Sequence, residues 1–313
     1  MTDCVEPFAS IGTVIIDDII LPDGQSRMGE LGGGVTHAVM GMRVWTDEAA
    51  IIAPVGEDFP PDLWDRLAEH FDVRGLLRRR GPTPRAWQLF ENDGKRSEVF
   101  RTDFDEMVRQ IPAPDEFPTA FRSLQGMHLH CHPDQMEEWV HFLRERGCPV
   151  ILWEPWDVFC VPENRERFRA LAPLVDVVSP NLGEMRAMTG ADDPQEAVRA
   201  LLDAGARIAA LRMGGGGSLV VDSAGKAVRV PALSIGAPVD ITGAGNAYGA
   251  GFVVGLARTG DLARAGTYGA VSSSFALQQF GALYPTAGLR EKAEARLDLL
   301  WSGVKPASLR CGS

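Results

Sequence analysis

The chain has 313 residues, of which 45% are hydrophobic and 23% are charged, and this composition fits a globular protein with one large α/β domain or two modest ones. Its net charge of −11 argues against nucleic acid or an anionic membrane surface as the main partner. The sequence has no run of about 18 apolar residues and no secretion signal at its start, so we expect a cytoplasmic protein.

The first predicted element is a strand that ends at a binding site. Residues 8–20 form a β-branched apolar run interrupted by Asp17 and Asp18, as expected of a buried strand whose C-terminal end opens on a site. Either carboxylate can instead simply end the strand in a turn. Residues 21–31 are polar and rich in turn residues, so this segment should project from the core.

A glycine turn and a helix come next. Gly32-Gly-Gly34 leads into an apolar helical pattern over residues 35–45, which contains His37. His37 has two open interpretations, as a substrate ligand or as a satisfied structural histidine. The next predicted strand and helix are residues 49–56 and 61–71.

A β-hairpin is predicted around residues 83–101. Its signal is the Asp93-Gly94 pair between two β-prone segments. Arg85, Arg96 and Trp87 can reach a substrate from this hairpin or remain ordinary residues of its strands.

From Gln125 onward, strand and helix patterns alternate, which predicts a parallel sheet with helices on both faces and ligands at the carboxyl ends of its strands. The predicted strands are residues 127–132, 150–154, 175–180, 208–213 and 218–221, and the predicted helices are 134–146, 163–171, 193–205 and 246–259. The first of these strands contains His128, His130, Cys131 and His132, but strand geometry argues against a zinc site because Cys131 would face away from the histidines.

Two motifs lie at starts of helices. Asn181-Leu-Gly-Glu184 follows a strand and a proline, and its spacing is that of a capping box. Residues 238–252 contain Gly243 and Gly245 directly before an apolar helical pattern, so the backbone can turn sharply and present its N–H groups to an anion. Asp240 and Thr242 precede that helix and can cap it or reach a phosphate or metal.

These motifs resemble the ribokinase/PfkB family of sugar and nucleoside kinases, over almost the whole chain. The resemblance implies a ribokinase-like three-layer α/β sandwich with a mostly parallel central sheet, as a single domain over residues 1–313. It also implies a small β lid from segments of about 20–32 and 82–104. The cofactors implied are ATP and Mg²⁺, the substrate is a sugar-like molecule, and pairing of lid strands implies a homodimer.

The resemblance also assigns roles to single residues. Gly243, Ala244 and Gly245 would form the anion hole, and Asn246 would orient the attacking hydroxyl. The residues expected at the substrate are Asp17, Gly33, Gly34, His37, Arg85 and Trp87. Those expected at the nucleotide are Asn181, Arg212, Gly215, Gly217, Thr242 and Gly281, and those expected at Mg²⁺ are Glu184 and Asp240.

Asn246 stands where the family carries the aspartate that takes the proton from the hydroxyl. An amide has no basicity at neutral pH, so three interpretations remain open. In the first, the protein is a working kinase in which a carboxylate such as Asp17 or Asp240, or a water, relays the proton. In the second, it is a binding relative that acts as a sensor or regulator. In the third, Asn246 was introduced in place of an aspartate to trap a substrate complex. Several stretches, among them Ile15-Ile-Asp-Asp-Ile19 and Trp153-Glu-Pro155, resemble a branch known from fungi that ends the motif in Asn, which favours a natural Asn246.

Overall fold

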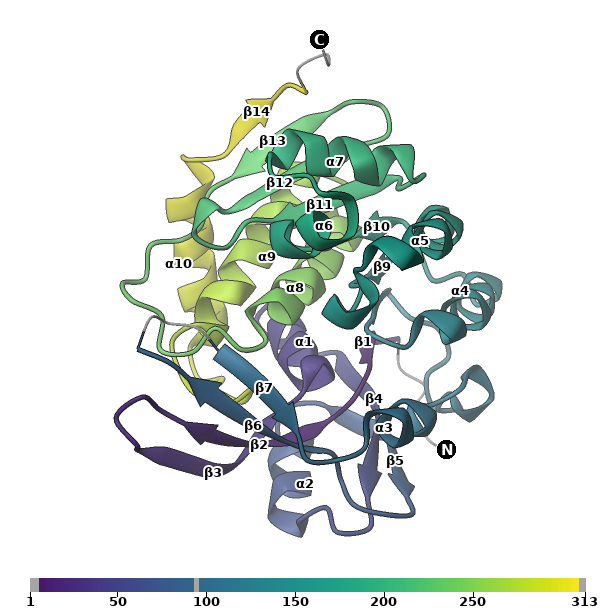
Figure 1. Ribbon diagram of the computed structural model, residues 1–313, viewed down its shortest axis with the longest axis vertical. Helices are drawn as coiled ribbons and strands as arrows, with labels where there is room; N and C mark the ends of the chain where they lie inside the picture. Colours follow the sequence, from purple (N-terminus) through teal and green to yellow (C-terminus); the bar gives the residue numbers. More distant parts are fainter. Residues whose placement is uncertain (1–5, 93–95, 310–313) are drawn as a thin grey trace.

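A computed structural model describes residues 6–92 and 96–309, and Figure 1 shows their arrangement around one large sheet. This sheet has ten strands in the order β14-β13-β12-β11-β10-β9-β8-β1-β4-β5. The strands are β1 (Phe8–Ile11), β4 (Ala49–Gly56), β5 (Asp72–Arg79), β8 (Gly126–Leu129), β9 (Ile151–Trp153), β10 (Val177–Val178), β11 (Ile208–Arg212), β12 (Ser218–Asp222), β13 (Ala227–Val230) and β14 (Lys305–Ala307).

Neighbouring strands from β5 across to β11 are parallel, whereas β12, β13 and β14 extend the sheet in antiparallel fashion. Every residue of β4 is buried, as expected of a parallel strand covered on both faces. The predicted α/β fold with a mostly parallel sheet is therefore confirmed.

Helices cover both faces of the sheet, and each face has its own apolar core. One core is built on α1 (Gly34–Arg43), α2 (Pro61–Ala68), α8 (Ala244–Thr259), α9 (Leu262–Ala276) and α10 (Leu289–Trp301). The other is built on α3 (Phe104–Gln110), α4 (Met136–Glu145), α5 (Arg165–Leu171), α6 (Leu182–Thr189) and α7 (Pro194–Asp203). The result is the predicted three-layer arrangement.

The lid is a separate four-stranded sheet in the order β3-β2-β6-β7, which Figure 1 shows at the lower left. Its strands are β2 (Ile15–Ile20), β3 (Ser26–Gly32), β6 (Arg85–Phe90) and β7 (Arg96–Phe100). Strands β6 and β7 pair in the antiparallel manner expected of the predicted hairpin. The predicted turn at Asp93-Gly94 lies outside the described residues.

The prediction of one continuous strand over residues 8–20 is wrong. The chain forms β1 in the main sheet, leaves it after Ile11, and enters the lid as β2. Both halves are apolar and almost wholly buried, so their composition does not reveal the crossing. The segment expected to project, residues 21–31, supplies most of β3, which pairs with β2.

Helix α1 and helix α8 approach each other closely behind the site. A Cβ atom on Gly41 of α1 would lie 2.5 Å from the carbonyl oxygen of Ala247 in α8, so only glycine permits this approach. This packing fixes the first turn of α8 against α1. Within residues 6–92 and 96–309, no helix is both long enough and apolar enough to cross a membrane.

Candidate active site

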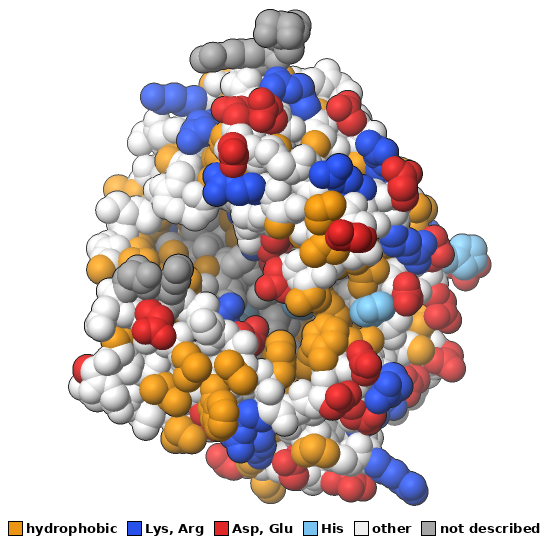
Figure 2. Space-filling view, in the orientation of Figure 1, with side chains coloured by type: hydrophobic (Ala, Val, Ile, Leu, Met, Phe, Trp, Pro, Cys, Tyr) orange, Lys and Arg blue, Asp and Glu red, His pale blue; other side chains and the backbone are white. Residues whose placement is uncertain are grey.

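A cleft of about 770 Å³ separates the lid from the main sheet, and Figure 2 shows it as the hollow in the middle of this face. Its floor contains residues that lie at or within three positions after the ends of β1, β8, β9, β10 and β11, where parallel sheets place their ligands. The lining includes Thr13, His130, Glu154, Trp156, Asn181, Glu184 and Arg212 from the sheet side, Gly33, Gly34, His37, Thr242, Gly243, Gly245 and Asn246 from α1 and α8 and the loops before them, and Asp17, Arg96, Glu98, Phe100, Phe104 and Met107 from the lid and α3.

The first turn of α8 points into this cleft. Gly243 is the N-cap with φ of 70°, and a Cβ atom there would lie 1.9 Å from the ring of His37. A Cβ atom on Gly245 would lie 1.7 Å from a guanidinium nitrogen of Arg212. A side chain at either position would have to displace His37 or Arg212, and the helix end borders the cleft. The N–H group of Ala244 donates to the carbonyl oxygen of Ile241 at 3.4 Å.

Thr242, immediately before this turn, carries a buried hydroxyl that makes no hydrogen bond of good geometry among the described residues, although it lies near the carboxylate of Asp240 and acts to lower the pKa of that group. A buried polar atom without a partner is costly, and a bound phosphate oxygen would satisfy it. The helix end, Thr242 and Arg212 together form a site suited to an anion.

Arg212 is held in a buried network of charges. Its guanidinium lies 2.9 Å from Glu154 and 3.5 Å from Glu184, and it donates to the carbonyl oxygen of Ser179. Burial acts to raise the pKa of Glu154, but Arg212 and His128 outweigh it and lower this pKa to about 2. Arg212 thus joins Glu154 to Glu184.

Glu184 forms the predicted capping box with Asn181. One carboxylate oxygen accepts from the backbone N–H of Asn181 and the other from its side chain, both at 2.6 Å. Burial raises the pKa of Glu184 to about 7, against the opposing effects of Arg212 and Asn181. Both oxygens already have protein partners, so Glu184 fits a metal best through an intervening water.

Asp240, the second residue expected at Mg²⁺, accepts a hydrogen bond from the backbone N–H of Thr242 at 2.7 Å. It is buried and does not belong to the cleft lining. In the part of the chain that the structure describes, no cluster of three His, Cys, Asp or Glu side chains could hold a metal ion.

The three neighbouring histidines have different environments. His128 is buried between Ser10 and Glu154, with one ring nitrogen 2.9 Å from each partner. His130 lines the cleft, whereas His132 lies outside it and caps the turn that follows.

Asp17, Gly33, Gly34 and His37 meet at the lid end of the cleft. Burial raises the pKa of Asp17 to about 7, although Gln88, which donates to its carboxylate at 2.9 Å, acts in the opposite direction. Burial and the charge of Arg96 lower the pKa of His37 to about 4, so its ring is neutral. The Nε2 atom of His37 is buried without a partner among the described residues and could bind a substrate oxygen.

The structure does not bring Arg85 and Trp87 to the cleft. These two residues of β6 face away from it, Arg85 toward Asp58 at 3.3 Å and Trp87 beneath Arg101. Gln88 of β6 and Arg96 of β7 belong to the polar network on the cleft side, where Arg96 donates to Gln88 at 2.5 Å.

Four other predicted contacts also lie outside the cleft lining. Ala244 offers its backbone in the first turn of α8. Gly215 and Gly217 lie in the exposed turn after β11, and Gly281 lies against Glu30 of β3. One side of the cleft is aromatic, where Phe104 lies edge to face with Phe100 and Trp156, and nothing in the sequence pattern marked Phe100 or Phe104 as site residues.

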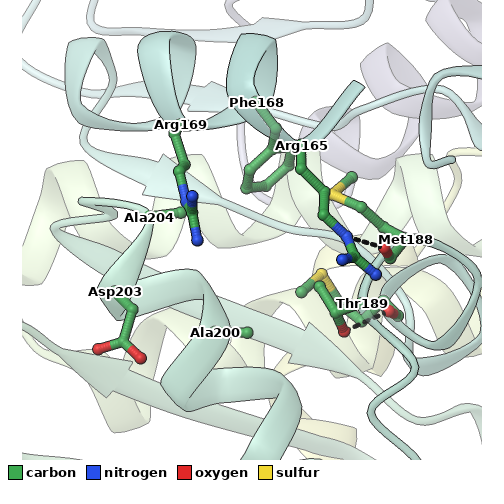
Figure 3. Close-up of a pocket in the computed structure, with 9 residues that line it drawn as sticks. Arg165, Phe168, Arg169, Met188, Thr189, Ala200, Asp203 and Ala204 are labelled. Atoms are coloured by element: carbon green, nitrogen blue, oxygen red, sulfur yellow. Dashed lines mark hydrogen bonds between the residues drawn. The ribbon is translucent and has the colours of Figure 1, made fainter. Parts of the chain in front are cut away.

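A second cavity of about 240 Å³ lies between α5, α6 and α7 and shares no lining residue with the cleft. Figure 3 shows Arg165 and Arg169 reaching toward it from α5, with Arg165 donating to the carbonyl oxygen of Met188 at 2.6 Å.

Comparison with known proteins gives a family and a fold. The sequence profile of the pfkB family carbohydrate kinases matches residues 8–287. A cytidine kinase of Thermococcus kodakarensis is 29% identical over 252 residues, covering 79% of this chain and 87% of the relative. An uncharacterized protein of Schizosaccharomyces pombe is 26% identical over 312 residues, covering 88% of this chain and 85% of the relative.

Among solved structures, the Escherichia coli protein called ribokinase II, in complex with ATP and Mg²⁺, superimposes with a TM-score of 0.74. The two chains are 19% identical, and the match covers 94% of this chain and 100% of the other. This likeness shows that the fold is ribokinase-like.

Proposed function

Because this chain belongs to the pfkB family of carbohydrate kinases, we propose that it transfers the γ-phosphoryl group of ATP to a hydroxyl of a sugar or of a sugar-containing small molecule. The observation that carries the proposal is the shared cleft. The start of α8, which suits an anion, and the carboxylate of Asp17, which suits hydroxyls, line the same cleft. Transfer of a phosphoryl group requires its donor and acceptor to be held together in this way.

The phosphates would bind at the start of α8. The N–H groups of Gly243, Ala244 and Gly245 would donate hydrogen bonds to the oxygens of the transferred phosphoryl group. The hydroxyl of Thr242 and the guanidinium of Arg212 would add further donors. Developing charge on a transferred phosphoryl group is stabilised most by donors already held in place. Arg212 meets that condition because Glu154, Glu184 and Ser179 all hold its guanidinium.

Mg²⁺ would arrive with the nucleotide, as bound in the E. coli relative. Glu184 would hold the ion through a water molecule, and Asn181 would orient the carboxylate of Glu184. Asp240 lies outside the cleft lining and would attract the ion by its charge, through the loop that precedes α8. When bound, the ion neutralises phosphate charge. Contacts of Gly215 and Gly217 with the phosphates and ribose of the nucleotide, and of Gly281 near its adenine, remain predictions.

The substrate would bind at the lid end. Asp17 would accept hydrogen bonds from two neighbouring hydroxyls, and Gly33 and Gly34 would let the substrate approach the backbone. His37 would contact a third oxygen, and Asn246 would orient the attacking hydroxyl through its side-chain carbonyl. Arg85 and Trp87 would reach the substrate only if the lid changed its register or orientation.

The second candidate function is a sensor or regulator that binds nucleotide or sugar without turnover, and Asn246 is the observation that favours it. We assign Asn246 to a natural branch with this residue in place of aspartate. The stretches Ile15-Ile-Asp-Asp-Ile19 and Trp153-Glu-Pro155, which resemble that branch, support this assignment.

The test is ADP release with Mg²⁺ and ATP across sugars, polyols and nucleosides, in parallel for the unmodified chain and Asn246→Asp. We expect turnover by the unmodified chain, with the Asp variant no more than about tenfold faster. Gly243→Val should abolish turnover in both backgrounds, because its side chain would overlap His37. Activity in the Asp variant alone would establish the binding function instead.

We also propose a homodimer formed through the outer face of the lid. Figure 2 shows apolar side chains gathered over the lid strands, and Met28, Trp87 and Val99 are exposed there. We expect light scattering to give twice the 33.9 kDa mass of the chain, and Met28→Asp with Trp87→Asp to give the single mass. A single mass for the unmodified chain at micromolar concentration would contradict the dimer.

A further inference from the structure

His130 lies beside Asn246 at the reacting end of the cleft. A Cβ atom built on Gly34 would lie 2.7 Å from Nδ1 and from Cε1 of His130, and 3.1 Å from the side-chain nitrogen of Asn246. These are the three nearest atoms to that point, and none belongs to a carboxylate. The imidazole and the amide therefore flank the same glycine of the substrate-binding turn.

The ring of His130 is also free to act. No hydrogen bond to either of its ring nitrogens occurs among residues 6–92 and 96–309, whereas both nitrogens of the neighbouring His128 are bonded. Its ring is placed by packing, 5.8 Å from the ring of Trp156 and stacked 6.3 Å from that of His128. Packing of this kind orients a side chain without using its lone pair.

The surroundings keep this ring neutral in the unliganded protein. Burial lowers the pKa of His130 to about 4, and the nearby charges act in both directions. Glu154 and Asp157 favour the imidazolium, whereas His128 and Arg212 oppose it. A neutral imidazole can accept a proton, and Glu154 then lies where it would stabilise the resulting cation.

Other proton acceptors in the cleft are less suitable. Glu154 and Glu184 already pair with Arg212, and Asp240 does not line the cleft. Two further carboxylates line it, but Glu98 accepts from Gln88 at 2.7 Å in the lid and Asp157 accepts from the backbone N–H of Val158 at 2.7 Å. Asp17 is bonded to Gln88 in the lid, and its proposed role is to accept from hydroxyls that do not react.

We propose that His130 accepts the proton of the attacking hydroxyl, a role that the amide of Asn246 cannot fill. This inference rests on the proposed kinase function. As the substrate oxygen bonds to the γ-phosphorus of ATP, its proton moves to Nδ1 of His130. The bond from that phosphorus to the β,γ-bridging oxygen breaks, ADP leaves with the electron pair, and His130 afterwards returns its proton to solvent.

The test compares His130→Gln with the unmodified chain in steady-state turnover, using the acceptor found in the panel above. Glutamine keeps a polar side chain but has no basicity, so we expect kcat to fall about 10²-fold while KM changes less than about threefold. His141→Gln is the control, because His141 is exposed on α4, outside the cleft, and pairs with Glu145. It should leave both constants unchanged.

The decisive arm repeats His130→Gln in the Asn246→Asp background, where the new carboxylate can take the proton. There we expect the substitution to cost less than about threefold. A His130→Gln variant that keeps its kcat, or that loses the same factor in both backgrounds, would overturn the inference and leave the kinase function standing. Absence of turnover in the unmodified chain and in Asn246→Asp, with every acceptor, would overturn the kinase function and the inference with it.

Discussion

Asp17→Asn should stabilise the unliganded protein at pH 8 and at the same time weaken substrate binding strongly. The folded state raises the pKa of Asp17 to about 7, whereas an unfolded aspartate titrates near 3.9. Between these values the folded chain holds a proton that the unfolded chain has lost, so this group makes stability fall as pH rises from about 4 to 7. Above pH 7 the ionised, buried carboxylate of Asp17 lowers the free energy of unfolding by about 2–4 kcal/mol, and a neutral asparagine avoids this cost.

Chemical denaturation of the two proteins at pH 8 and pH 4 measures this effect. The variant should be the more stable at pH 8 and nearly equal at pH 4, while its KM for the substrate rises about 10²-fold through lost charge-assisted hydrogen bonds. Asp18→Asn is a matched control on the same strand. Asp18 accepts from the backbone of Gly29 and from Arg101, outside the cleft, so its replacement should destabilise the protein and leave KM unchanged. Destabilisation by Asp17→Asn at pH 8 would contradict the expected ionisation.

Arg212→Met should remove both stability and turnover. The substitution leaves Glu154 ionised and buried without its guanidinium partner, a change that typically costs about 3–5 kcal/mol of unfolding free energy. The loss of a fixed cation at the transferred phosphate should lower kcat by at least about 10²-fold. Arg207→Met is the control, because Arg207 is exposed and pairs with Asp176 at 3.5 Å on the surface.

The stability part of this prediction depends on pH. In the unmodified chain the pKa of Glu154 is lowered to about 2, so its contribution is present above the unfolded pKa near 4.3 and is lost as pH falls toward 2. Without Arg212, burial favours the protonated form, and the deficit of the variant should be smaller at pH 5 than at pH 8. A second change, Glu154→Gln, should recover most of the stability but not kcat. An equal deficit at both pH values would contradict this account.

The parts of the fold that depend on local patterns could be predicted from the sequence. The alternation of strands and helices after Gln125, the capping box at Asn181 and the glycine turn before α8 each depend on neighbouring residues, and the structure contains all three. The edge elements were missed. Strand β5 mixes apolar residues with four charged ones, and β14 has only three residues, so neither has the continuous apolar pattern of a buried strand.

Site residues that belong to one local motif could be predicted from the sequence. Site residues whose position depends on tertiary contacts could not. Arg85 and Trp87 were expected at the substrate, but β6 turns Ala86 and Gln88 inward, and the face that a strand presents is set by its pairing with β2. The histidine motif was expected to be one strand, yet β8 ends at Leu129, so the chain turns and sends His130 and His132 in different directions. No spacing rule in the sequence marks that end.

The central position of β1 has a consequence for how the chain must fold. Strand β1 pairs with β4 on one side and with β8, more than a hundred residues later in the chain, on the other. The face of α1 that contains Gly41 is covered later still, because it packs against α8 near residue 247. Contacts so distant along the chain form slowly, and the apolar face of α1 remains uncovered until they do. A nascent chain released before α8 is complete would therefore expose this face and be prone to aggregate.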